Sequence, residues 1–115
     1  MLDDVTISTL HAALNGLAAR ERALSDNIAN VNTPYFRART VSFENELKRA
    51  LTDGDDPLAI RPQVQFSDAP GGLTGNNVNL TDTTVAAMNT QLAYELAVRA
   101  TGDRFSLYRS AVRGA

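Results

Sequence analysis

The path of the chain is decided by residues 25–38, which read SDNIANVNTPYFRA (Ser25–Ala38). A residue that precedes proline avoids the helical region, so a helix that reaches the Thr33-Pro34 pair must end there. Asparagine amides in this stretch can pair with the backbone groups that a helix end leaves open. Beyond the proline we expect an extended chain that carries two aromatic side chains onto a new surface. The residues that form this junction motif are Asn27, Asn30, Asn32, Thr33, Pro34, Tyr35 and Phe36.

Before the junction, residues 4–30 have helical periodicity, because apolar side chains recur three and four residues apart. Frequent alanines favour the helix and keep it thin, whereas Gly16 weakens its middle by roughly 1 kcal/mol relative to alanine. The apolar side chains on this helix that are candidates for an interface are Leu10, Leu14, Leu17, Leu24 and Ile28.

Residues 81–112 predict a second long helix, which Asn79 or Thr81 can cap. At 100° per residue, one face of this helix carries Val85, Met88, Leu92, Leu96 and Leu107. The nearly opposite face carries Tyr94, Val98, Phe105, Tyr108 and Val112. A helix with two apolar faces must be covered on both sides. The N-terminal helix can cover one face, so the other requires a further partner. The residues of this helix that we expect at a subunit interface are Leu92, Tyr94, Val98, Phe105 and Tyr108.

Residues 52–79 have a different character, with turn-forming clusters at 53–57 and 69–72. Between these clusters, residues 60–66 alternate weakly and predict a short edge strand, since Pro62 disfavours a central one. Just before them, residues 41–51 predict a short helix with a Glu44–Lys48 pair.

The sequence therefore predicts a mainly α protein in one structural domain. Its two long terminal helices pack as an α-helical hairpin or coiled coil, around a loop-rich middle with room for a short β element. The parts are residues 1–51 (N-terminal helix, junction and short second helix), 52–79 (loop-rich insert) and 80–115 (C-terminal helix).

The composition argues against catalysis, metal binding and nucleic-acid binding. The 115 residues carry a formal net charge of −2, which disfavours nucleic acid as a partner, and they include no cysteine. His11 is the only histidine and has no acidic or nucleophilic neighbour on its helix face. We therefore predict no catalytic residue, no cofactor and no metal site, and interpret the acidic stretch 53–56 as a solvated loop. Arg37 and Arg39 lie beside two aromatic residues and favour a protein–protein contact over a bound base.

Two segments resemble one known family. The run N-I-A-N-x-N-T-P with a following aromatic and basic residue is similar to the signature of the flagellar axial proteins, which comprise rod, hook and hook-associated subunits. A second segment resembles the start of the terminal helix in the short proximal rod proteins of that family, and its residues are Gly75, Asn76, Asn77, Val78 and Leu80. The chain departs from the family pattern at Tyr35, where glycine is usual, so that the turn is expected to differ, and at Thr83 and Thr84, where a Glu-Met pair is usual.

The resemblance implies a structural subunit of the proximal rod of the bacterial flagellar basal body. Such a subunit polymerises through its terminal helices into part of a torque-transmitting drive shaft with a central export channel. The partners that the resemblance implies are copies of the chain, the second short rod protein FlgC, distal rod subunits, the rod–ring adaptor FliE, the inner-membrane MS ring and the flagellar type III export apparatus.

The N-terminus Met1-Leu2-Asp3-Asp4 does not have the basic start and apolar run of a cleavable signal peptide. In agreement with this, the resemblance implies export without cleavage of a signal peptide, to the periplasmic side of the inner membrane. Two other classes of function stay open. A helical adaptor or secretion-chaperone-like protein would form a discrete dimer, and a small enzyme or nucleic-acid module would show turnover or salt-sensitive binding.

Overall fold

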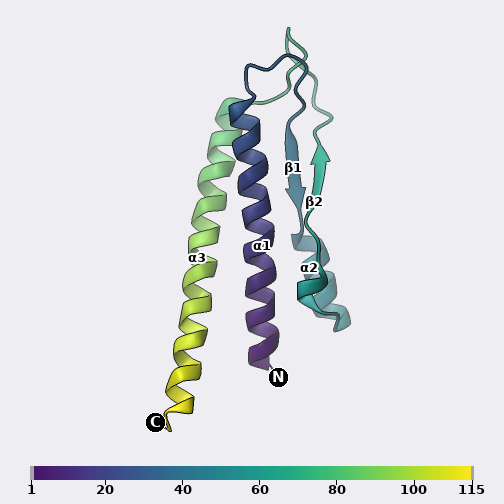
Figure 1. Cartoon of the computed structure of the whole chain (residues 1–115). Helices are drawn as coiled ribbons and strands as arrows, with labels where there is room; N and C mark the ends of the chain where they lie inside the picture. The colour runs from purple at the N-terminus through teal and green to yellow at the C-terminus, as the bar shows by residue number, and fades with distance from the viewer. Residues whose placement is uncertain (1, 115) are drawn as a thin grey trace.

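The computed structural model describes residues 2–114 and consists mainly of two long antiparallel helices. Helix α1 (Leu2–Ala29) and helix α3 (Leu80–Val112) lie side by side, as Figure 1 shows, and the hydroxyl of Tyr108 donates to the Asp4 carboxylate across 3.3 Å. The molecule is a flat, elongated body of 65 × 27 × 14 Å. The predicted helical hairpin is confirmed, and so is the cap, because the Asn79 side chain accepts a hydrogen bond from the Asp82 backbone amide.

The face of α3 that packs on α1 consists mainly of threonine and alanine. Thr83 and Thr90 are buried, and the hydroxyl of each donates to the carbonyl four residues earlier, at 2.6 and 2.8 Å. Each buried hydroxyl therefore keeps a hydrogen-bond partner within the helix. Ala12 and Ala23 are buried on α1. Of the two predicted apolar faces of α3, α1 covers only part of one, at Tyr94 and Tyr108. Elsewhere α1 covers the strip of small residues between the two faces.

The middle of the chain packs on the other side of α1 (Figure 1). It contains strand β1 (Arg39–Ser42), helix α2 (Glu44–Asp53), the 3-10 turn η1 (Pro57–Ala59) and strand β2 (Gln63–Phe66). The strands pair antiparallel, with Val41 opposite Val64, so the predicted β element is present. The helix predicted from residue 41 begins at Glu44 instead, because Val41 lies in β1. The helix ends at Asp53 and is followed by Gly54, which has a φ of 77°.

A small core joins the two sides of α1. Leu17, Val41 and Phe43 are buried together, and Tyr94 of α3 packs against them. The Phe43 ring lies over Gly16 so closely that a Cβ built on this glycine would collide with the ring. Gly16, which weakens the isolated helix, therefore allows the close approach of the segment between β1 and α2.

Candidate assembly surface and junction

The end of α1 is tied to the start of β1 by one asparagine side chain. The Asn27 amide nitrogen donates to the Arg39 carbonyl at 2.8 Å, and its oxygen accepts from the Arg39 backbone amide at 2.9 Å. Asn27 is only 2% exposed. The Asn27 side chain thus forms the pair of hydrogen bonds with β1 that a neighbouring strand would form. The Asn30 side chain donates to the Asp26 carbonyl at the helix end, as expected.

The two sequence segments singled out above are hydrogen-bonded to each other. The Asn76 amide donates to the carbonyls of Asn30 and Thr33, both at 2.8 Å. The Asn77 oxygen accepts from the Ala38 backbone amide at 2.6 Å. Its nitrogen donates to the carbonyls of Ser67 and Ala69, both at 3.1 Å. The sequence analysis did not predict this contact, although asparagines cluster both in the junction motif and at the end of the loop-rich insert.

Tyr35 takes the backbone conformation that glycine would take. Its φ is 62°, in the left-handed region, and its amide donates to the Thr74 carbonyl at 2.9 Å. The ring lies against Gly75, where an added Cβ would come within 2.6 Å of the Tyr35 Cδ1 atom. The expectation of a different turn is therefore wrong, because the chain keeps a glycine-like turn with a tyrosine in it.

The two arginines near the junction are bound within the chain. The Arg39 guanidinium lies 5.5 Å from the Phe36 ring centroid and 5.7 Å from that of Phe66. Arg37 donates to the Ala69 carbonyl at 3.0 Å. These contacts hold the junction to β2 and the segment after it, so the cation–aromatic pairs expected at a contact with another protein are found inside the molecule.

A second clamp, which the sequence did not reveal, joins α1 to α2. Arg20 donates to both Glu44 carboxylate oxygens at 2.7 and 2.6 Å and to the Val41 carbonyl at 2.8 Å. Its guanidinium also lies 5.0 Å from the Phe43 ring centroid. The bonds from Arg20 lower the pKa of Glu44 to about 2, against the opposing effect of partial burial.

Residues predicted at a subunit interface on α1 differ in exposure. Leu17 and Leu24 are buried inside the chain, so they are already covered. Leu10 and Leu14 are half-buried, and Ile28 is 36% exposed.

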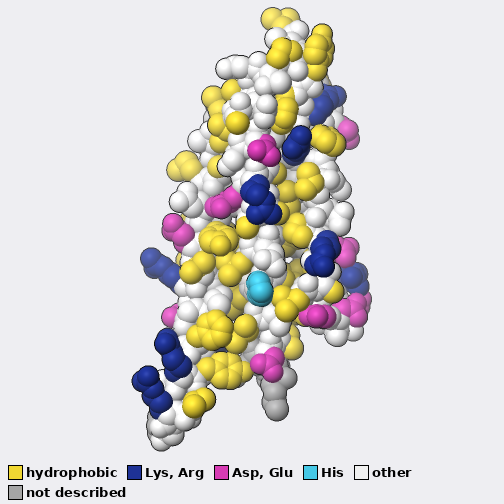
Figure 2. Space-filling view, viewed as in Figure 1, with side chains coloured by type: hydrophobic (Ala, Val, Ile, Leu, Met, Phe, Trp, Pro, Cys, Tyr) yellow, Lys and Arg dark blue, Asp and Glu magenta, His cyan; other side chains and the backbone are white. Residues whose placement is uncertain are grey.

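Helix α3 keeps most of its large apolar side chains in contact with water. Leu92 is 57% exposed and Phe105 is 50% exposed, whereas Tyr94 and Tyr108 are half-buried beside α1. The exposed set lies on both flanks of the threonine–alanine strip and consists of Val85, Met88, Leu92, Leu96, Val98, Phe105, Leu107 and Val112. Figure 2 shows hydrophobic side chains in patches along the long axis of the molecule. A pattern of this extent on a helix is typical of a protein–protein interface.

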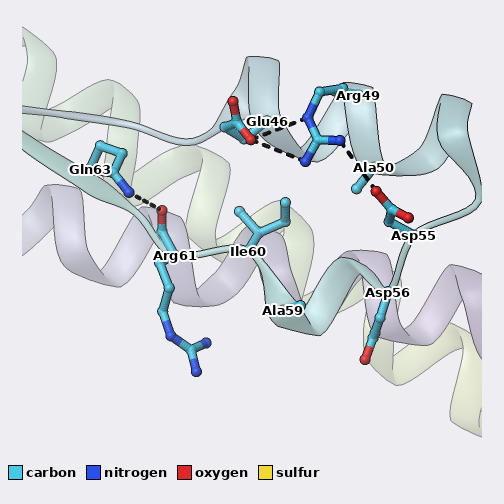
Figure 3. A pocket seen from close by; sticks show the side chains of 9 residues that line it. All are labelled: Glu46, Arg49, Ala50, Asp55, Asp56, Ala59, Ile60, Arg61 and Gln63. Atoms are coloured by element: carbon cyan, nitrogen blue, oxygen red, sulfur yellow. Dashed lines mark hydrogen bonds and ion pairs between the residues drawn. The ribbon is translucent and has the colours of Figure 1, made fainter.

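A hollow beside α2 gathers charged side chains (Figure 3). Arg49 forms ion pairs with Glu46, Asp53 and Asp55 at 3.2–3.3 Å, which raise its pKa, and the Asp56 carboxylate caps η1. The carboxylates thus have structural partners. Within residues 2–114 no three or more His, Cys, Asp or Glu side chains form a group that could hold a metal ion. None of the described helices is long and apolar enough to cross a membrane.

Comparison with known proteins finds relatives over most of the chain. A flagellar basal body rod protein FlgB of Aeromonas hydrophila is 30% identical over 117 residues, which cover 89% of this chain and 88% of the relative. The FlgB of Bacillus subtilis is 25% identical over 121 residues, covering 95% and 94%. That of Borreliella burgdorferi is 29% identical over 107 residues, covering 75% and 79%. No protein-family model matches the chain.

Proposed function

Because this chain belongs to the FlgB family of flagellar basal body rod proteins, we propose that it polymerises through α1 and α3 as a structural subunit of the proximal rod. The polymer would be part of the drive shaft that transmits torque, and its subunits would surround the channel for exported proteins. We propose no catalytic activity, in keeping with relatives that are named as rod proteins.

The observation that carries this proposal is the exposed apolar surface of α3. A hairpin of two helices covers only one side of each helix, and here the covered side of α3 holds mainly threonine and alanine. Contact with further helices would remove the remaining apolar area from water, which stabilises an assembly by roughly 25 cal/mol per Å². Many copies of one such contact would make a stiff tube.

The proposed interface consists of the predicted residues that intrachain packing leaves at least partly accessible, namely Leu10, Leu14, Ile28, Leu92, Tyr94, Val98, Phe105 and Tyr108. The junction motif is proposed to fix the angle between this helical surface and the middle of the chain, since its asparagines bond both parts.

Its family places the protein in the flagellar basal body rod. We propose that its neighbours there are copies of itself, FlgC and distal rod subunits above, and FliE and the MS ring below. The proposed location is the periplasmic side of the inner membrane, reached through the flagellar type III export apparatus without cleavage of a signal peptide.

A gene deletion in the source bacterium, complemented with the intact gene, tests the function. We expect the deletion to abolish swimming and electron micrographs of its basal bodies to show rings without a rod. Complementation should restore both. Normal rods and hooks in the deletion strain would contradict the proposal and favour the helical adaptor, which a discrete dimer in solution would support.

A further inference from the structure

Two segments on opposite flanks of the molecule carry opposite net charges. Helix α2 and the turn after it, residues 44–56, hold five acidic and two basic side chains, a net charge of −3. The second half of α3, residues 99–113, holds four arginines and one aspartate, a net charge of +3. Figure 2 shows Lys and Arg side chains gathered at the C-terminal end of α3, and Asp and Glu side chains on the opposite flank beside α2.

The acidic flank keeps its excess charge although it contains ion pairs. Arg49 is the single cation that Glu46, Asp53 and Asp55 share. One guanidinium cannot neutralise three carboxylates, so the end of α2 attracts further cations. The flank is solvent-exposed, and its attraction is therefore felt over a Debye length of about 8 Å at physiological salt.

Each flank also carries apolar surface. On α3, Val98, Phe105 and Val112 are exposed and follow one another every seven residues, which makes a straight row along the helix. On the other flank, α1 and α2 enclose an apolar groove lined by Ala13, Leu17, Phe43, Leu47 and Leu51. Lys48 and Glu44 also line this groove, and Glu44 is paired with Arg20.

The row and the groove lie at the same height on the molecule. Tyr108 contacts Asp4, and α1 and α3 are antiparallel, so Ala13 lies about 14 Å from that contact, at the level of Arg99. Val98 is therefore level with the groove. Helices α2 and α3 also run in the same direction (Figure 1), so that the acidic end of α2 and the basic end of α3 lie toward the same end of the molecule.

We propose that the second half of α3 in one copy docks in the α1–α2 groove of a second copy lying beside it in the same orientation. The Val98–Phe105–Val112 row would enter the groove, and Arg109 and Arg113 would face Asp53 and Asp55. The contact joins two different surfaces, so each copy keeps one surface for the next neighbour and a row or helix of copies can grow. This inference rests on the proposed assembly function and names its lateral contact.

Cysteine cross-linking tests the contact, because the chain has no cysteine of its own. Full-length Val98→Cys and Leu51→Cys chains are mixed, oxidised with copper phenanthroline and separated on a non-reducing gel. The expected result is a disulfide-linked dimer that contains one chain of each kind. The control replaces Val98→Cys by Leu73→Cys, which is fully exposed in the turn before Asn76. Equal yields from the two mixtures would overturn the proposal.

Charge reversal tests the same contact without relying on one variant. Arg109→Glu with Arg113→Glu on the Val98→Cys chain should lower the yield about tenfold at low salt, and Asp53→Lys with Asp55→Lys on the Leu51→Cys chain should do the same. Combining both reversals should restore it, because opposite charges again face each other. Loss without restoration would overturn the proposal.

The inference and the proposed function can fail separately. Normal rods in the complemented strain together with no specific cross-link would overturn the lateral contact and leave the rod function standing. A specific cross-link that both charge reversals abolish and their combination restores, in a chain whose deletion leaves rods intact, would support the contact and contradict the rod function.

Discussion

The side chain of Asn27 and the backbone of Arg39 form a closed pair of hydrogen bonds, at 2.8 and 2.9 Å, in the buried corner where α1 meets β1. An asparagine amide has the same donor and acceptor as a peptide group, so it can continue the ladder of a strand whose outer partner is a helix. The middle of the chain is attached to the helical hairpin at this corner.

Asn27→Ala should therefore lower the free energy of unfolding by about 2–3 kcal/mol, because it leaves the amide and the carbonyl of Arg39 without a partner in a buried place. Urea unfolding followed by helical circular dichroism measures the change. Asn32→Ala, at an exposed position of the same motif, is the matched control and should change stability by less than about 0.5 kcal/mol. Equal changes in the free energy of unfolding for the two variants would mean that the two hydrogen bonds of Asn27 do not stabilise the fold.

Gly16 and Gly102 both lie inside long helices and should respond in opposite directions to alanine. Gly102→Ala meets no atom within 4 Å and should stabilise the protein by about 1 kcal/mol through helix propensity. Gly16→Ala would push its Cβ into the Phe43 ring and should destabilise the protein despite the same propensity gain. Thermal unfolding of the two variants decides this, and a stabilised Gly16→Ala would refute the close packing on Phe43.

Tyr35 should be replaceable by glycine with a gain in stability. The left-handed φ of 62° costs a non-glycine residue about 1–2 kcal/mol, partly offset by the greater freedom of glycine in the unfolded chain. The ring is 81% exposed, so that little packing is lost. Tyr35→Gly should raise the free energy of unfolding by about 0.5–1 kcal/mol, and Tyr35→Val should lower it. Identical stabilities of the valine and tyrosine chains would contradict the strained turn.

The Arg20–Glu44 clamp should make stability depend on pH at the acid end. The pKa of Glu44 is lowered from 4.5 to about 2 in the folded chain, so its contribution is fully present above pH 4.5 and is lost as the pH falls toward 2. Because the Glu44 side chain is more than half exposed, we expect a contribution of only about 1 kcal/mol. Glu44→Gln should be less stable than the parent at pH 7, and the difference should vanish near pH 2. A difference in stability between the two chains that increases as the pH falls would contradict this role of the clamp.

The long elements of the fold were predictable because their signals are local. Periodic leucines indicate α1, and the Thr33-Pro34 pair ends the helical signal within a few residues of Ala29. Asn79 caps α3, and its side-chain bond reaches only three residues along the chain. Family membership was also predictable, since the junction motif is long and has fixed spacing.

The contacts between distant segments were not predictable from periodicity. Strand β1 is four residues long and depends on β2 and Asn27 for its hydrogen bonds, so its sequence has no strong strand signal. The buried face of α3 was overlooked because threonine counts as polar, although Thr83 and Thr90 satisfy their hydroxyls within the helix. The Arg20–Glu44 clamp spans 24 residues and has no spacing rule that could reveal it.

The central claim is that the apolar flanks of α3 are buried between subunits of the rod. Leu92→Asp and Phe105→Asp would each place an unpaired charge in that interface, while Gln91→Asp and Ser106→Asp add the same charge at exposed polar positions of α3. The measurement is electron microscopy of basal bodies from the deletion strain complemented with each variant. We expect rods with the two control variants and rings without rods with the other two. Normal rods and swimming in a strain that carries both Leu92→Asp and Phe105→Asp would contradict it.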